Sequence, residues 1–144
     1  MNVKIKKLDP RATIPTYGTD ASAGMDLYAL LDEPVTINPG ETFMVHMGLS
    51  MEIPDGYVGL VFARSGLATK KGLAPANKVG VVDSDYRGEL MTPIHNHSKE
   101  PRVIENGERV AQMILTPYIK ADFDLVEELD DTERGTKGFG STGA

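Results

Sequence analysis

The sequence predicts an all-β domain, a β-barrel or sandwich of jelly-roll type, with one short helix and a flexible glycine-rich arm at its C-terminal end. Three observations support this. Short segments rich in β-branched residues alternate with turns of Gly, Pro, Asn and Asp. Helical periodicity is confined to one stretch of the chain. The last eleven residues carry four glycines and one aromatic side chain, which is too little apolar surface to order a segment.

The clearest strand runs from Phe43 to Ile53, where apolar side chains recur at every second position. This period of two predicts one buried face and one half-exposed face. Turns at 38–40 and 54–56 are expected on either side of it. Further strands are predicted at 35–37, 57–63, 79–82, 90–94, 102–104 and 110–116.

The single helix is predicted over residues 65–72. Ser65 is expected to cap its first turn, and Gly72 is expected to close it.

The chain is sized for one domain, with 144 residues of which 40% are apolar. Its longest apolar runs fall far short of the roughly 18 residues that a membrane-spanning helix needs, so no membrane partner is expected. The sequence contains no cysteine, which excludes disulfides and thiolate metal sites and favours a cytoplasmic location. We place the barrel domain at residues 1–121, and an acidic tether with the arm at 122–144.

The formal net charge of −6 argues against a nucleic-acid partner, because broad binding to nucleic acid needs clustered Lys and Arg. One small phosphate ligand is still possible, since a local pocket of donors is enough to bind it. The segment Arg64-Ser65-Gly66, where a predicted strand enters the predicted helix, is the best candidate for such a pocket. An ordinary helix cap has the same pattern.

The segment GVVDSDYRG at 80–88 predicts a strand, a tight polar turn and a return strand through 90–91. Two carboxylates, Asp83 and Asp85, and the ring of Tyr86 meet at the end of this hairpin. An aspartate there could hold and polarise an attacking water, and the tyrosine face could pack on a sugar or base. Alternatively, both aspartates only shape the turn.

Two other stretches carry candidate polar groups. Arg109 and Gln112 follow a predicted turn at 106–107, and we expect their side chains to share one face of a strand. Asp26 begins an apolar segment, where it could hold a metal-bound water or simply end a strand.

The glycine-rich arm could bind a polyphosphate. Its glycines would let backbone N–H groups wrap the phosphates, Arg134 could pair with them, and Phe139 offers a planar face for a base. The same composition is typical of a disordered tail.

Five stretches together resemble, in order and across nearly the whole chain, the five motifs of the trimeric dUTPase family. They are AGMDLYA at 23–29, ARSGLA at 63–68, NKVGVVDSDYRGELM at 77–91, GERVAQM at 107–113 and RGTKGFGSTG at 134–143. A chance match to all five is negligible. The resemblance implies hydrolysis of dUTP to dUMP and pyrophosphate, which limits uracil incorporation into DNA and supplies dUMP for dTMP synthesis.

The resemblance also implies a jelly-roll barrel that forms a homotrimer, with three active sites at subunit interfaces. Each site would be assembled from three chains, the arm of one subunit closing over a site built by the other two. This agrees with the composition of the arm, which has no core of its own and would order on ligand binding.

Carried over by position, the resemblance implies that uracil and deoxyribose lie in the hairpin that ends at Met91. Tyr86 would pack beneath the deoxyribose and exclude a 2′-hydroxyl. The narrow hairpin would reject a 5-methyl group and a cytosine amino group. Uracil would be bound by the side chain of Asn77 and the backbone around Gly80, Val81 and Val82.

The same resemblance assigns the phosphates to Arg64, Ser65 and Gly66. The distal phosphate would be gripped by the arm, and Phe139 would stack on the uracil. The other residues of the arm that it assigns to the substrate are Arg134, Gly140 and Ser141.

Mg²⁺ is the implied cofactor, held mainly by the three phosphates and by waters, one or more of which would touch Asp26. Asp83 would orient and deprotonate the water that attacks the α-phosphorus in line, and Gln112 would fix that water. A carboxylate of ordinary acidity is a weak base at neutral pH. Positioning and charge stabilisation would therefore supply most of the rate enhancement.

Two positions depart from the family pattern. Many members have Pro at the position of Ala63, and the arm usually has Gly at the position of Lys137. Ala63 would relax the turn without removing a ligand group. Lys137 would be strained if its position needs a positive φ, and could otherwise contact the γ-phosphate.

Two alternatives remain beside dUTP hydrolysis. A dCTP deaminase would share the barrel and the trimer, but it needs a carboxylate base beside C4 that cannot be placed outside the dUTPase pattern. A non-catalytic nucleotide-sensing module would be favoured by loss of Asp83, Gln112 or the arm, and all three are present.

Overall fold

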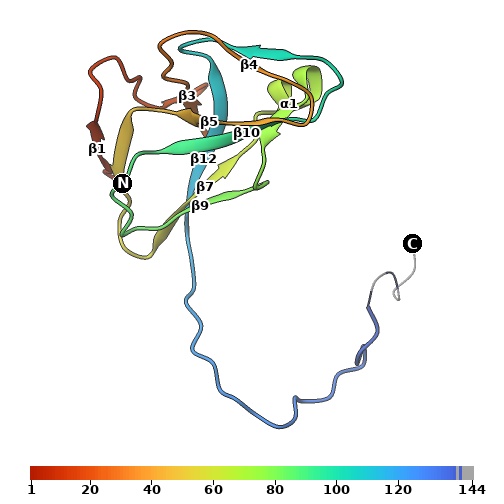
Figure 1. Ribbon diagram of the computed structural model, residues 1–144. Helices are drawn as coiled ribbons and strands as arrows, with labels where there is room; N and C mark the ends of the chain where they lie inside the picture. Colours follow the sequence, from red (N-terminus) through yellow and green to blue (C-terminus); the bar gives the residue numbers. More distant parts are fainter. Residues whose placement is uncertain (139, 141–144) are drawn as a thin grey trace.

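The computed structural model describes residues 1–138 and residue 140, and its strands form a barrel from which the C-terminal segment runs away as a long arm (Figure 1). The helix α1 (Ser65–Lys71) lies between β7 and β8 in the chain. In order, the strands are β1 (Lys4–Lys7), β2 (Thr16–Tyr17), β3 (Met25–Tyr28), β4 (Val35–Ile37), β5 (Thr42–His46), β6 (Leu49–Glu52), β7 (Tyr57–Phe62), β8 (Leu73–Pro75), β9 (Gly80–Val82), β10 (Met91–Asn96), β11 (Arg102–Ile104) and β12 (Arg109–Pro117). The prediction of an all-β fold with one short helix is confirmed for this part of the chain.

Antiparallel pairing organises these strands into one large sheet and several small ones. The five-stranded sheet has the order β2-β3-β12-β7-β9, and the three-stranded sheet has the order β5-β10-β8. β1 pairs with β6, and β11 pairs with β4. Apolar side chains from every sheet fill the interior, and their burial is the main stabilising contribution. The side chains that are at most 2% exposed include Leu27, Ile37, Val45, Leu49, Leu73, Ile94, Ile104, Val110 and Met113.

The strand predicted as one element from Phe43 to Ile53 is in fact two strands, so that prediction was wrong in its extent. The chain breaks after β5 and resumes as β6, which pairs with β1 instead of β10. Gly48 lies at the break with a φ of +66°. The apolar alternation continues through the break because both strands bury the same side of the chain, so periodicity could not reveal it.

Gly48 is also packed on its open side. A Cβ atom there would collide with Leu30 Cδ2 and lie 3.1 Å from the Cβ of Ala12. The backbone N–H groups of Leu8 and Asp9 both point to the Gly48 carbonyl, at 2.8 and 3.4 Å. Glycine is therefore required here both by conformation and by space.

The helix ends as predicted but begins differently. Gly72 adopts a left-handed conformation with a φ of 66°, and its N–H donates to the carbonyl of Ala68. Arg64 occupies the N-cap position with no side-chain capping bond. Ser65 is the first helical residue, so the prediction that its hydroxyl caps the helix was wrong.

The hairpin predicted between 80 and 91 does not form as a paired ladder. β9 pairs with β7 in the large sheet, whereas β10 pairs with β5 and β8 in the three-stranded sheet. The two ends of the segment are therefore splayed apart. The separation leaves one edge of β9 without a neighbouring strand among residues 1–138, since β9 is the last strand of its sheet.

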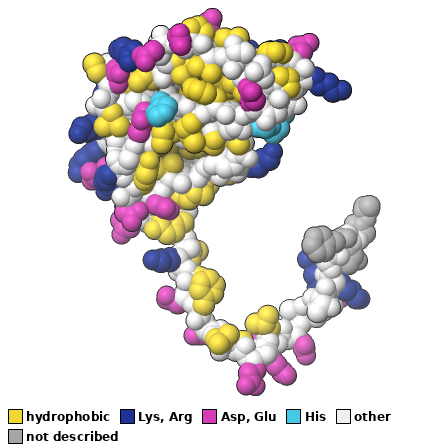
Figure 2. Space-filling model, in the orientation of Figure 1, with side chains coloured by type: hydrophobic (Ala, Val, Ile, Leu, Met, Phe, Trp, Pro, Cys, Tyr) yellow, Lys and Arg dark blue, Asp and Glu magenta, His cyan; other side chains and the backbone are white. Residues whose placement is uncertain are grey.

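After β12 no described residue lies in a helix or strand, and the side chains project into solvent. Phe123 and Leu125 are almost fully exposed. Acidic side chains gather along the outer bend of this arm (Figure 2). Lys137 does not have a positive φ, so its side chain causes no backbone strain there. No helix among residues 1–138 is long and apolar enough to cross a membrane.

Gly48→Ala is expected to lower the free energy of unfolding by about 3 kcal/mol, from a left-handed alanine and from overpacking, each costing about 1–2 kcal/mol. Gly40→Ala is the matched control, because Gly40 has a φ of +78° and open space around it. Gly40→Ala should lose only the part of the free energy of unfolding that comes from a left-handed alanine. Urea unfolding of the two variants measures the difference, and equal losses would contradict the packing role of Gly48.

Candidate active site

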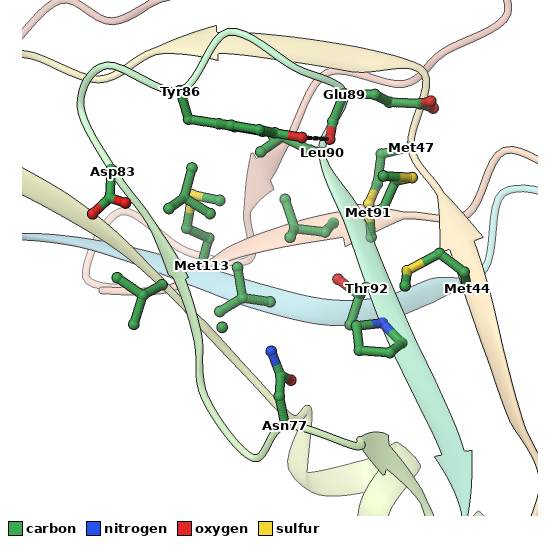
Figure 3. Close-up of a pocket in the computed structure, with 16 residues that line it drawn as sticks. Met44, Met47, Asn77, Asp83, Tyr86, Glu89, Leu90, Met91, Thr92 and Met113 are labelled. Carbon is green, nitrogen blue, oxygen red and sulfur yellow. Dashed lines mark hydrogen bonds between the residues drawn. The ribbon is translucent and has the colours of Figure 1, made fainter.

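A cavity of about 330 Å³ opens between the splayed segments β9 and β10 (Figure 3). Its floor is apolar, because Leu27, Val61 and Met113 project into it from the large sheet. The residues of the segment 77–91 that the resemblance assigned to the nucleoside all lie on its wall, and so does Asp83. The nucleoside residues are Asn77, Gly80, Val81, Val82, Tyr86 and Met91. The structure thus brings the nucleoside group together in one place.

Local turn geometry directs the Asn77 side chain into this cavity (Figure 3). Lys78 has a φ of 66°, the only positive φ of a non-glycine residue in the described chain. The turn is closed by the Lys78 N–H, which donates to the Pro75 carbonyl at 3.1 Å. A Cβ at Gly80 would lie 3.3 Å from the Val61 Cβ and 3.4 Å from Asn77 Nδ2. Gly80 therefore allows the Asn77 amide to lie close against the free edge of β9.

Tyr86 lies across the mouth of the cavity and is 41% exposed. Its hydroxyl donates to the Glu89 carbonyl at 2.9 Å. The ring passes so close to Gly88 that a Cβ there would lie 2.8 Å from Tyr86 Cε2. Gly88 is thus the residue that lets the tyrosine ring fold back over the opening.

Asp83 stands at the edge of the same opening (Figure 3). Its backbone carbonyl accepts the Tyr86 N–H at 3.2 Å, which is the turn-shaping role that the sequence left open. Its carboxylate makes no hydrogen bond or ion pair with the described residues. Both roles are compatible, because the backbone shapes the turn while the side-chain oxygens stay available to a water or a ligand.

A second polar cluster, formed by Asp26, Arg64, Arg109 and Gln112, lies on β3, on β12 and at the N-cap of α1. Asp26 is 8% exposed, and its Oδ1 accepts Arg64 Nε at 2.7 Å. The other oxygen, Oδ2, accepts Arg109 Nη1 at 3.2 Å. Since both oxygens face guanidinium groups, Asp26 orients two cations.

Gln112 completes this cluster and pairs in register with Asp26 on β3. Its Nε2 donates to the Ala63 carbonyl at 2.9 Å, so its Oε1 remains an available acceptor. A Cβ at Gly24 would lie 2.6 Å from that Oε1. Gly24 was not among the site residues predicted from the sequence, although a glycine just before a strand can signal a close approach.

Arg109 and Gln112 do lie in one cluster, but not for the reason expected. Residues three apart lie on opposite faces of a regular strand. The register between β12 and β3 shifts between Arg109 and Ala111, and this bulge returns Arg109 to the Asp26 side. Arg109 was not selected as a site residue.

The two groups of residues face opposite sides of the five-stranded sheet. Leu27, Val61 and Met113 point into the cavity, and successive residues of a strand point to opposite faces. Their chain neighbours Asp26 and Gln112 therefore point away from it, as does Phe62, which pairs with Gln112. A single chain does not bring these two groups together.

The remaining predicted site residues lie in neither group or outside the described part. Ser65 and Gly66 are exposed in the first turn of α1, and a Cβ at Gly66 would meet nothing within 4 Å. Arg134 is exposed on the arm. Gly140 is described with a φ of +91°, whereas Phe139 and Ser141 lie outside the described residues.

The fit to a metal ion is indirect. Among the described residues, no three His, Asp or Glu side chains are grouped to hold one. Asp26, the predicted contact, already faces two guanidinium groups, at 2.7 and 3.2 Å. Mg²⁺ retains several waters and commonly binds through one or two carboxylates together with substrate phosphates. The donor set fits an ion that arrives with a polyphosphate better than a resident ion.

Comparison with known proteins identifies a family. A family model described as dUTPase matches residues 10–143. The deoxyuridine 5′-triphosphate nucleotidohydrolase of Desulfitobacterium hafniense is 48% identical over 147 residues, covering 99% of this chain and 97% of that relative. The dUTPase of Staphylococcus bacteriophage 80alpha with dUPNHPP superimposes with a TM-score of 0.87, at 30% identity and 99% coverage of both chains.

A further solved structure is a variant dUTPase from phage phi11 of S. aureus, described as showing the coordination of a structural Mg(II) ion. It superimposes with a TM-score of 0.78 at 25% identity, covering 89% of this chain and 98% of that one. These likenesses confirm the predicted jelly-roll form of the fold.

Thr92→Val is expected to raise the free energy of unfolding by about 1 kcal/mol, because it removes a buried hydroxyl that lacks a partner. Thr92 is 2% exposed on the β10 wall of the cavity, and its Oγ1 has no hydrogen bond within the described residues. Thr36→Val, at an exposed position of β4, is the control. Chemical unfolding measures the free energy of unfolding of each variant. A Thr92→Val protein that is less stable than the unaltered protein would contradict the expectation.

Proposed function

The chain belongs to the dUTPase family, and from this membership we propose that it hydrolyses dUTP to dUMP and pyrophosphate. The observation that carries the proposal is the cavity between β9 and β10. It has an apolar floor, an amide at one side, and a tyrosine and an uncommitted carboxylate at its mouth. Such a pocket fits a base and a sugar, with the phosphates left outside.

Recognition of uracil is proposed to use the unpaired edge of β9. A strand edge presents alternating N–H and C=O groups, and uracil presents alternating carbonyl and N–H groups along its own edge. The base can therefore pair with residues 80–82 much as another strand would, while the Asn77 amide adds a further contact. A cytosine would place its amino group where an acceptor is needed.

Tyr86 is proposed to pack beneath the deoxyribose, where its ring excludes a 2′-hydroxyl. Beside it, Asp83 would hold the water that attacks the α-phosphorus and take its proton. Gln112 of a neighbouring subunit would accept a hydrogen bond from that water through Oε1, since its Nε2 is bound to Ala63. Removal of this proton accounts for only part of the rate enhancement, and placement of the water supplies much of it.

The phosphates are proposed to bind at Arg64, Ser65 and Gly66. Asp26 holds Arg64 through Nε, which leaves the terminal guanidinium nitrogens available for phosphate oxygens. Mg²⁺ bound to the phosphates would neutralise charge that develops on the leaving pyrophosphate. Asp26 would touch that ion only through water, because both of its oxygens already face arginines.

The active unit is proposed to be a homotrimer with sites shared between subunits. The nucleoside cavity and the Asp26 cluster face opposite sides of one sheet, so a nucleotide can touch both only if a second chain supplies one of them. The arm, which makes no core of its own, would close the site from a third chain, with Arg134 and residues 139–141 on the nucleotide.

A cytoplasmic location is proposed from the absence of cysteine.

A dCTP deaminase is less well supported, because the described residues that line the cavity include no uncommitted carboxylate other than Asp83. Glu89 also lines it, but its two oxygens accept the Gly48 N–H and face His46 Nδ1, each at 2.9 Å. That carboxylate points away from the cavity (Figure 3).

Asp83→Asn is expected to lower kcat for dUTP at least about 100-fold, because the amide cannot take the proton of the attacking water. Asp85→Asn, two residues along the same turn, should change kcat by less than about threefold. Pyrophosphate release with Mg²⁺ is the measurement. Absence of release from the unaltered protein would favour a nucleotide-binding module, and ammonia from dCTP would favour a deaminase.

Removal of residues 134–144 is expected to leave a folded trimer by light scattering, with turnover reduced by at least about tenfold because the site stays open to water. Mixed trimers of this deletion and Asp83→Asn test the sharing of sites. Random 1:1 assembly should restore about one quarter of the sites. In these sites Asp83 comes from the deletion variant and the arm comes from Asp83→Asn. If each site were complete within one chain, mixing the two variants would restore no turnover.

A further inference from the structure

Glu89 ties two parts of the molecule together at the rim of the nucleoside cavity. Its carboxylate accepts the Gly48 N–H at 2.9 Å through Oε1 and lies 2.9 Å from His46 Nδ1 through Oε2. Its backbone carbonyl accepts the Tyr86 hydroxyl, also at 2.9 Å. Figure 3 shows the side chain turned away from the cavity and the carbonyl turned toward Tyr86.

The barrel side of this link is rigid. Gly48 sits at the break between β5 and β6, held by its positive φ and by the close approach of Leu30 and Ala12. Neighbouring backbone bonds add to the attachment. Met47 N–H donates to the Leu90 carbonyl at 3.1 Å, and Leu90 N–H donates to the Leu49 carbonyl at 2.7 Å. Glu89 is therefore anchored to a part of the fold with little freedom.

The cavity side of the link depends on that anchor. Tyr86 is 41% exposed, so packing alone does not fix its ring. Its hydroxyl makes one hydrogen bond among the described residues, and the acceptor is the Glu89 carbonyl. Movement of the Glu89 backbone would therefore move the tyrosine ring relative to the cavity floor.

We propose that Glu89 is a positioning residue that holds Tyr86 at the cavity mouth and thereby sets the discrimination between deoxyribose and ribose. The proposal rests on the function proposed above, in which the Tyr86 ring excludes a 2′-hydroxyl. Discrimination by exclusion requires a wall that does not yield. A tyrosine released from Glu89 can tilt outward, and the space below it then admits the extra hydroxyl.

Glu89→Ala removes both carboxylate bonds and is expected to lower the ratio of kcat/KM for dUTP to kcat/KM for UTP by at least about fivefold. Most of the change should come from a raised KM for dUTP and improved use of UTP. Glu89→Gln keeps an acceptor for the Gly48 N–H and should restore most of the ratio. His46→Ala removes only one of the two contacts and should leave the ratio within about twofold of the unaltered protein.

A purely structural role for Glu89 predicts an unchanged ratio of kcat/KM for dUTP to kcat/KM for UTP. Loss of stability or of active protein would reduce turnover of dUTP and UTP equally, and their ratio would not move. A folded Glu89→Ala protein with an unchanged ratio would therefore overturn the proposal. Calorimetric affinities for dUMP and UMP provide the same comparison without catalysis.

Tyr86→Phe supplies a second test if Glu89→Ala does not fold. Phenylalanine keeps the ring but loses the bond to the Glu89 carbonyl, so the same ratio should fall. Where Glu89→Ala does fold, combining it with Tyr86→Phe should lower the ratio little further than Tyr86→Phe alone, because both act through one link. An unchanged ratio in Tyr86→Phe would also overturn the proposal. Failure of the unaltered protein to cleave dUTP would instead refute the proposed function.

Discussion

The separation of β9 from β10 is the constraint on which the rest of the molecule depends. The two strands are joined by a short polar loop, yet each pairs with a different sheet. A paired hairpin would have consumed the backbone groups of both strands and closed the space between them. Because they diverge, the barrel keeps a cavity with an apolar floor and an unpaired strand edge, which together are what a nucleobase needs.

The alternation of side chains along the large sheet explains why the candidate site residues are divided between its two faces. β3, β7 and β12 send Leu27, Val61 and Met113 into the cavity, and their neighbours Asp26 and Gln112 to the other face. The candidate residues thus lie on two faces of one sheet and do not meet within one chain. Under the proposed function, the site is shared between subunits and the arm covers it.

Close backbone approach fixes the site as much as hydrogen bonding does. Gly24 leaves room for the Gln112 amide, and Gly88 leaves room for the Tyr86 ring. Gly48 leaves no room for a side chain, and its backbone N–H donates to the Glu89 carboxylate. Gly24 and Gly88 thus let the side chains of Gln112 and Tyr86, two candidate site residues, approach the backbone closely.

The sequence by itself determined the all-β class, the single helix and most strands, because period two and turn residues are local signals. The resemblance also predicted residues that lie together on the cavity wall, since residues 77–91 form one continuous segment. Only the tertiary structure decided that the strand at 43–53 breaks at Gly48, that Ser65 does not cap α1, and that β9 and β10 diverge. It alone placed Arg109 beside Asp26 through a bulge, and Glu89 beside Gly48. Pairing partners and close contacts join residues distant in the chain, so no local pattern can encode them.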